Sequence, residues 1–527
     1  MLITALVVSL SYMIGTTVNR SQTLKKMNIT AWGPVIMIRT RLGLGLLDTL
    51  ASKKRLWRFV ASAGVPLVVA GMLYIFLLLL LMNYVMIRFT PEPSSYTAPR
   101  NILLIPGVNQ FIPLVWGWVA LLVTMVVHEM AHGILCRVEG VRVKSMGVAL
   151  LAFPVAAFVE PDDEELFGTP QKPAVASRSA RVRILSAGVI SNFIVAFLAM
   201  ALFFGPVIGA ITPLDRVVVA DVENDTAADL AGFQKSMIVL GLNGTSTSSL
   251  EELYQNFSRT SGYSELHLQN GDRQMDIPLQ GKPERGVLVV SILEDSPASA
   301  AGMPERFVIT GIGGRPVKGL NEFRAVMNDT LPGQNITVET NKGVFPISLD
   351  TKEDGKGFIG VILSGDAVNV DGVTFQVFPA GSFLAALKAI PHSGLAGMNS
   401  MMGLPFTGIP GFTEDGFQGF SGWIANFFQP SGWAAPLGGK LFWITNFLLW
   451  VGWINLYAGL FNCLPAVPLD GGHIFRDLLR SFFDRFVRDA ARAEKMTSTV
   501  VAILAWLIFS SLLFTVVAPY LAHGILS

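Results

Sequence analysis

Two histidines and a glutamate are grouped in an apolar part of the sequence. Residues 126–134 read VVHEMAHGI, so His128 and His132 are four residues apart and Glu129 lies between them. On a helix, side chains four residues apart lie on one face, one turn from each other. Two imidazoles in this arrangement can bind one zinc ion, and the adjacent glutamate can act as general base on a water that the zinc activates. Because a buried charge needs a partner or a metal, we predict a zinc site here, with Glu129 as its base.

A catalytic zinc ion takes three protein ligands and leaves a fourth position for water. Residues 462–472 read NCLPAVPLDGG and follow a long apolar stretch, so Asp470 is the candidate for the third ligand. Irregular backbone at membrane depth persists only where it is buried in protein or lines a cavity, and Gly471 and Gly472 would let the backbone approach another segment closely. The alternative is that Asp470 simply caps a helix.

The composition indicates a membrane protein. Of the 527 residues, 51% are hydrophobic and only 15% are charged, compared with about 25% in soluble domains. The net charge of +1 gives no polybasic signal, so we expect no nucleic-acid partner. The two cysteines, Cys136 and Cys463, do not form a disulfide framework.

Six apolar stretches are long enough to span a bilayer as helices, which needs about 20 residues. They are residues 1–17, 64–87, 112–135, 184–211, 441–464 and 497–521. A signal peptide is the alternative for the first stretch, but its basic residues follow the apolar core, which favours a retained helix.

The basic residues of the loops predict the orientation. Residues 18–60 contain nine basic residues and a single acid, Asp48, and residues 471–496 are also basic. Because basic loops stay in the cytoplasm, both segments are predicted there and residues 212–440 are predicted outside. The histidine motif and Asp470 then lie at the same depth, toward the cytoplasmic side of what we expect to be the cell membrane.

The predicted outside region contains an internal repeat. Residues 222–244 and 292–314 align without a gap at an offset of 70 residues. Both copies have an Ala-Gly pair and further glycines at the same aligned positions. Each copy reads as strands and short helices, and it resembles the permuted PDZ domains of bacterial and archaeal proteases. PDZ domains bind extended peptides at a sheet edge. A duplicated β-rich spacer without a ligand is the alternative.

The paired motifs resemble those of the site-2 proteases, which are intramembrane zinc metalloproteases. That family combines HExxH with a later NxxPxxPLDGG, and this sequence has HEMAH and NCLPAVPLDGG. The resemblance implies zinc ligands at His128, His132 and Asp470, and a general base at Glu129.

Two further segments are similar to this family. Residues 186–192, SAGVISN, resemble its middle core helix, except that Val189 stands where a proline often occurs. Residues 153–161 resemble its membrane-associated hairpin. We also predict that Asn192 and Asn462 hold the substrate backbone or an oxyanion, although hydrogen bonding between helices is an equal alternative.

The sequence therefore predicts a polytopic α-helical membrane protein with about six transmembrane helices and an inserted β-rich, tandem PDZ-like extracytoplasmic region. The expected divisions are an N-terminal membrane part (1–111), the first half of the protease core (112–211), two PDZ-like units (212–283 and 284–365), an amphipathic connector (366–440), the second half of the core (441–480) and a C-terminal segment (481–527).

The resemblance implies a zinc metalloendopeptidase that hydrolyses peptide bonds in or near transmembrane segments. The expected substrate is a single-span membrane protein that another protease has already shortened. A non-catalytic scaffold that binds peptides through the PDZ-like pair is the main alternative. A transporter would also use intramembrane His and Asp, but would not require a third ligand in the same leaflet.

Overall fold

The computed structural model describes residues 2–524 except 42, 95–96, 102–103, 152, 170–171, 261, 352–354, 410–411 and 413–415. The chain divides into two compact units. The first comprises residues up to 205 together with those from 446 onward, and the second comprises residues 206–445.

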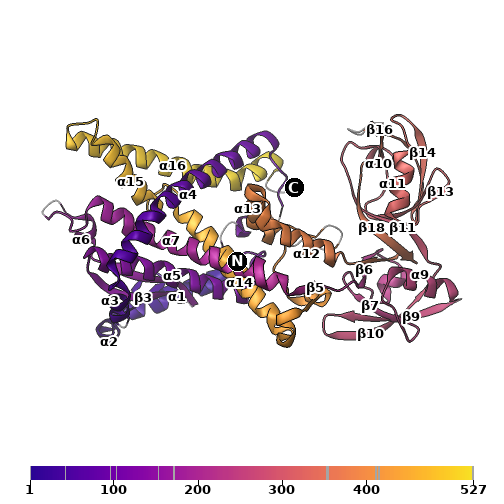
Figure 1. Ribbon diagram of the computed structural model, residues 1–527, viewed down its shortest axis with the longest axis horizontal. Helices are drawn as coiled ribbons and strands as arrows, with labels where there is room; N and C mark the ends of the chain where they lie inside the picture. Colours follow the sequence, from indigo (N-terminus) through magenta and orange to yellow (C-terminus); the bar gives the residue numbers. More distant parts are fainter. Residues whose placement is uncertain are drawn as a thin grey trace. The chain divides into compact units, whose positions relative to one another are not determined.

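The first unit is mainly helical (Figure 1). Its helices are α1 (Leu2–Arg20), α2 (Gln22–Lys26), α3 (Leu44–Ala51), α4 (Lys54–Phe89), η1 (Pro99–Asn101), α5 (Leu114–Glu139), α6 (Asp163–Phe167), α7 (Arg178–Leu202), α15 (Asp470–Phe483) and α16 (Ala490–His523). Helix α14 (Lys440–Asn462) begins in the second unit and ends in the first. Helix α7 packs against α4, α5 and α15, so it is the central helix of the site described below.

Five helices in the described part of the chain are long and apolar enough to cross a membrane. They are α4, α5, α7 with its continuation to Val207, α14 and α16. They coincide with five of the six predicted spans, and the chain is a multi-pass membrane protein. Helix α1 covers the predicted span at residues 1–17 but is not among these five, so that span stays a prediction.

Helix α5 carries the histidine motif, and both of its ends are well defined. It begins after Pro113 and ends at Gly140, whose φ of 83° lies in the left-handed region that glycine adopts without strain. At this end, Glu139 accepts hydrogen bonds from Arg58 of α4 at 3.2 Å and from Arg183 of α7 at 2.9 Å. The Glu139 carboxylate thus links α5, which carries the histidines, to α4 and α7.

A four-stranded antiparallel sheet lies beside α5 in the first unit. Its strands, in spatial order, are β1 (Ile29–Trp32), β2 (Val35–Thr40), β3 (Val143–Leu151) and β4 (Phe153–Pro161). The hairpin expected at residues 153–161 consists of β4, which spans those residues, and its partner β3. The N-terminal segment adds β1 and β2 to it, in a region where the sequence analysis assigned only a basic loop.

The second unit contains a long sheet and short helices. Its strands run in the spatial order β10-β9-β7-β6-β19-β18-β11-β12-β14-β15, with β8 and β13 as short side strands. The strands are β6 (Val217–Val222), β7 (Ile238–Leu242), β8 (Thr245–Ser246), β9 (Tyr263–Asn270), β10 (Arg273–Gln280), β11 (Glu284–Ile292), β12 (Phe307–Ile312), β13 (Arg315–Pro316), β14 (Asn335–Thr340), β15 (Gly343–Ser348), β18 (Val361–Val370) and β19 (Val373–Val377).

The sequence repeat is present as a structural repeat. Helix α8 (Ala227–Leu230) corresponds to α10 (Pro297–Ala300), and α9 (Leu250–Arg259) corresponds to α11 (Leu320–Asn328). Ser249 caps α9 by accepting a hydrogen bond from Glu252 N–H, which explains why the second helix of that copy begins there.

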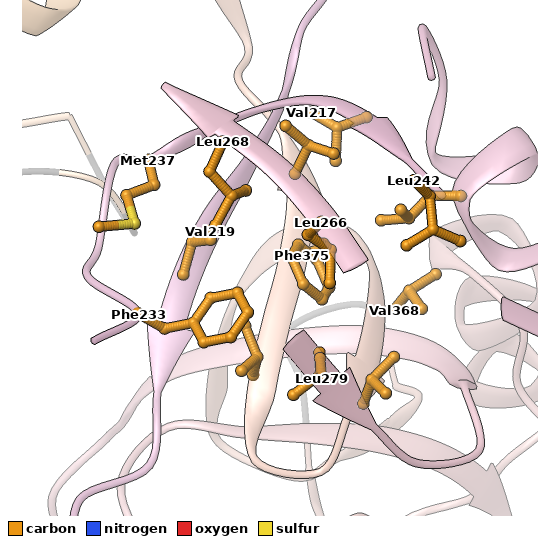
Figure 2. Close-up of a cluster of buried hydrophobic side chains, with 14 of the residues drawn as sticks. Val217, Val219, Phe233, Met237, Leu242, Leu266, Leu268, Leu279, Val368 and Phe375 are labelled. Carbon is orange, nitrogen blue, oxygen red and sulfur yellow. The ribbon is translucent and has the colours of Figure 1, made fainter. Parts of the chain in front are cut away.

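The core of the first copy extends beyond the predicted end of that unit at residue 283, and also past the predicted end of the second unit at residue 365. Figure 2 shows Val368 and Phe375 packed with Val219 and Leu266. Residues 284–361, by contrast, contribute most of a separate core around Val289 and Phe307. The second copy is therefore inserted into the first, and strands β18 and β19 return the chain to the first core. Because both strands lack counterparts in the aligned repeat, the offset of 70 residues gave no sign of this return.

The described residues between 378 and 439 form short helices around an aromatic cluster. The elements are α12 (Ala380–Ala389), η3 (Ile390–His392), α13 (Gly394–Gly403), η4 (Leu404–Phe406), η5 (Gly422–Phe427), β20 (Phe428–Pro430) and η6 (Gly432–Leu437), and β20 pairs with β5 (Ile211–Pro213). Phe378 and Phe427 are fully buried with ring centroids 4.2 Å apart. The interfacial placement expected for this region stays a prediction.

Candidate active site

Three side chains from two distant segments meet in the first unit. Nε2 of His128 lies 3.1 Å from Nε2 of His132, one turn along α5. Oδ2 of Asp470, the first residue of α15, lies 3.2 Å from the former atom and 3.3 Å from the latter. The structure thus brings together all three residues that the two motifs indicated as ligands.

The geometry of this triangle fits a tetrahedral zinc ion. An ion with Zn–N and Zn–O distances of about 2.0–2.1 Å holds its ligand atoms about 3.3 Å apart. The buried Oδ2 of Asp470 makes no hydrogen bond of acceptable geometry, although both imidazole nitrogens are close to it. This is expected when three ligand atoms are directed at a common centre and not at each other.

The imidazole of His132 is oriented by the backbone of α7. Its Nδ1 lies 2.8 Å from the carbonyl oxygen of Ile184, so Nδ1–H is the donor of this hydrogen bond. The lone pair is then on Nε2, which faces the ligand triangle. A hydrogen bond of this kind fixes the tautomer of a metal-binding histidine.

Asn192 contacts the other histidine. It is fully buried on α7, and its amide nitrogen lies 3.2 Å from His128 Nδ1, while its Oδ1 has no hydrogen-bond partner among the described residues. Since amide O and N are assigned from their partners, exchanging them lets Oδ1 accept the proton of Nδ1, which leaves the lone pair of His128 on Nε2. This contact favours a role in orienting His128, and the predicted contact of Asn192 with substrate stays a prediction. Asn462 is half-buried at the end of α14, and its role also stays a prediction.

Close backbone approach at glycines holds the ligands in place. A Cβ on Gly188 of α7 would lie 2.4 Å from His132 Nε2 and 2.5 Å from His128 Cε1. On the other side of the triangle, a Cβ on Gly471 would lie 2.5 Å from the carbonyl carbon of Cys463. Glycine is therefore required where α7 faces the histidines and where α15 begins. The role of Gly188 was missed, although the SAGVISN segment that contains it was the available signal.

The general-base candidate is held by the sheet. Oε2 of Glu129 accepts a hydrogen bond of 2.8 Å from the backbone N–H of Val159 in β4. A sequence pattern does not show which strand N–H faces a side chain, so Val159 was not identified beforehand.

Ion pairs connect α15 to the neighbouring helices α7 and α16. Arg181 of α7 makes two hydrogen bonds to the Asp477 carboxylate, at 2.7 and 2.9 Å, and both side chains are about 13–14% exposed. Arg178 pairs with Asp484, and Glu494 of α16 pairs with arginines of α15. Hydrogen bonds from Arg178 and then Arg480 hold the pKa of Asp484 below its usual range. Helix α15, and Asp470 with it, is thus anchored by charge.

Comparison with known proteins supports the chemistry that the geometry indicates. A sequence model of peptidase family M50 matches residues 116–508, more than half of the chain. An uncharacterized protein of Methanocaldococcus jannaschii is 31% identical over 235 residues, which cover 44% of this chain and 58% of that relative. Protease RseP of Yersinia pestis is 24% identical over 417 residues, covering 68% of this chain and 88% of the relative.

A Neisseria meningitidis protein that is named as a zinc metalloprotease is 23% identical over 408 residues, covering 67% of this chain and 88% of that relative. The matched region of the family model contains the histidine motif, Gly188 and Asp470. The chain therefore belongs to peptidase family M50, the membrane-bound zinc metalloproteases of the site-2 type.

Proposed function

We propose that this protein hydrolyses peptide bonds in or near the transmembrane segment of a single-span membrane protein. The observation that carries the proposal is the triangle of His128, His132 and Asp470, which has tetrahedral ligand spacing and lies beside a carboxylate on the same membrane-spanning helix. A bound zinc ion would polarise the scissile carbonyl and lower the pKa of water toward 7.

The residues of the chain supply the remaining chemistry. Glu129 takes a proton from the attacking water and later returns it to the leaving amine. Ile184 and Asn192 hold the two imidazoles in the orientation that directs Nε2 toward the metal. Because Gly188 has no side chain, α7 can lie directly against the two imidazoles.

Strand β4 is the proposed docking site for the substrate. It is an end strand of its sheet and pairs only with β3 among the described strands. A transmembrane helix shields its peptide bonds, so the substrate must unwind near the site. The extended segment could then add to the free edge of β4, next to Glu129.

The repeat unit fits a role in selecting substrates that another protease has already shortened. The end strands of the long sheet, β10 and β15, each contain a proline, Pro278 or Pro346, which lacks the N–H that an added strand would use. Strand β18 pairs with β11 over residues 361–369 but with β19 only over residues 367–370, so its residues 361–366 have one neighbouring strand among those described. The PDZ-like pair could therefore exclude bulky substrates or bind a trimmed end by strand addition at β18.

We infer from loop charge that the site faces the cytoplasm and that the repeat unit lies outside the cell. Leu230 and Phe486 are 84% and 72% exposed, on opposite sides of the membrane in this arrangement. A membrane-impermeant thiol reagent should label a Leu230→Cys variant of intact cells and leave Phe486→Cys unlabelled, in a background where Cys136 and Cys463 are replaced. The reverse labelling would contradict the orientation.

The function is tested by zinc analysis of the purified protein together with cleavage of a model single-span substrate. The wild type should contain one zinc ion per chain and cleave the substrate. Glu129→Gln should keep the zinc and lose about 10²–10⁴-fold in kcat. A Glu129→Gln variant that cleaves at the wild-type rate would favour the non-catalytic scaffold.

A further inference from the structure

The hydrogen bond between β4 and Glu129 shows which way the N–H groups of this strand point. Val159 lies opposite Met146 of β3, and Ala157 lies opposite Val148. In an antiparallel ladder, opposed pairs alternate between hydrogen-bonded and non-hydrogen-bonded. Because Val159 donates its N–H to Glu129, the Met146–Val159 pair is not hydrogen-bonded. The N–H groups of Val159 and Ala157 therefore both face the free edge of the sheet.

The approach of β4 to α5 is fixed by packing. Val159 is 8% exposed and belongs to the apolar cluster that includes residues of α5. A Cβ on Gly133, four residues after Glu129 on the same face of α5, would lie 3.2 Å from Val159 Cγ1. The missing side chain at Gly133 thus lets the strand lie against the helix, and it brings the Val159 N–H within hydrogen-bonding distance of Glu129.

We propose that the backbone N–H of Val159 is a positioning group for the general base. It holds Oε2 of Glu129 and leaves Oε1 to receive the proton of the attacking water. The inference rests on the proposed function, because it assumes that Glu129 is the base. It adds that one strand edge both receives the substrate and orients the base.

A consequence follows for the register of the substrate. The outward N–H of Ala157 remains available to a substrate carbonyl, whereas the N–H of Val159 is already taken by Glu129. The substrate ladder on β4 therefore ends beside Ala157. The next peptide group of the substrate leaves the sheet next to Glu129, on the helix that carries two of the three metal ligands.

The test removes the N–H of Val159 without removing its strand. Proline is compatible with this position because the N–H is not used in the ladder with β3. Pro161, two residues further along β4, already occupies a position that faces the same edge. We expect Val159→Pro to lower kcat about tenfold or more, within the contribution of a general base, while KM and the zinc content stay as in the wild type.

Two matched variants separate this role from a structural one. Val159→Ala keeps the N–H and measures the contribution of side-chain packing, and it should lose much less kcat than Val159→Pro. Ala157→Pro removes the neighbouring outward N–H, and it should raise KM more than it lowers kcat. A Val159→Pro variant that raises KM and keeps kcat would overturn the proposal, because Val159 would then only contact substrate.

If Val159→Pro does not fold, as judged by zinc content and thermal melting, the α-hydroxy acid analogue of valine at position 159 removes the N–H alone. The same loss of kcat is expected, and wild-type kcat in this analogue would overturn the proposal. Failure of the proposed function would look different, since Glu129→Gln would then cleave as well as the wild type.

Discussion

The two sides of the ligand triangle are held in place by different forces. The histidine side is fixed by close backbone packing of α5 against α7, with Gly188 next to both imidazoles. The aspartate side depends on α15, which is anchored by ion pairs to α7 and α16, and all of these except the mostly buried Arg181–Asp477 pair are partly exposed. Packing inside a protein responds steeply to added volume, whereas partly exposed ion pairs respond mildly to mutation, salt and pH. The histidine side should therefore be the more sensitive to small substitutions.

The largest effect is expected for Gly188→Ala. The added methyl group would overlap His132 Nε2 and displace the ligand atoms, because the helix backbone cannot move away without separating from α5. We expect zinc affinity to fall more than about 100-fold, beyond the 10–100-fold that outer contacts usually contribute. Titration of zinc into the apoprotein measures this.

Gly205→Ala is the matched control, since it lies in the same membrane span and its Cβ would meet open space. It should bind zinc as the wild type does. Wild-type zinc affinity in Gly188→Ala would show that the histidine side is not held by close packing.

The second effect is expected for Asn192→Leu, which fills a similar volume but removes the partner of His128 Nδ1. Loss of an orienting hydrogen bond should weaken zinc binding about 10–100-fold. A variant with normal zinc affinity and a raised KM would instead support the predicted contact with substrate.

The third effect is expected for Arg181→Ala, on the aspartate side. It leaves the Asp477 carboxylate unpaired in a mostly buried position, at a cost of about 2 kcal/mol in the free energy of unfolding. Zinc affinity should fall about tenfold or less. The exchanged pair Arg181→Asp with Asp477→Arg should restore part of both quantities if the ion pair anchors α15.

The smallest effect is a pH dependence of stability at the exposed end of α15. The pKa of Asp484 is lowered from its ordinary value of 3.8, first by the hydrogen bond from Arg178. The stabilisation is present above that ordinary value and is lost as the pH falls through the lower folded pKa. Thermal melting from neutral to acidic pH should show a smaller fall in melting temperature for Asp484→Asn than for the wild type. An equal fall in the two proteins would show that the Arg178–Asp484 pair does not stabilise the fold.

The motifs and apolar stretches were sufficient to predict the membrane fold, because hydropathy and fixed ligand spacing are local properties of the sequence. Gly188 and Val159 were not identified, because their roles depend on which helix face or strand edge meets the histidines and Glu129. The N-terminal hairpin of β1 and β2 was also missed, because the basic residues of 18–60 were used only to predict orientation, although two apolar runs flank Gly33-Pro34 there. The return of β18 and β19 to the first core arises from insertion of one repeat into another.

The most direct test of the central claim is zinc X-ray absorption spectroscopy of the purified protein, with the Asp470→Ala variant beside it. The wild type should contain one zinc ion with two imidazole nitrogens and a carboxylate oxygen at about 2.0–2.1 Å, and the variant should lose that oxygen or the metal itself. Sulfur in the coordination shell, or an unchanged spectrum and zinc content in Asp470→Ala, would contradict the claim that His128, His132 and Asp470 bind one zinc ion together.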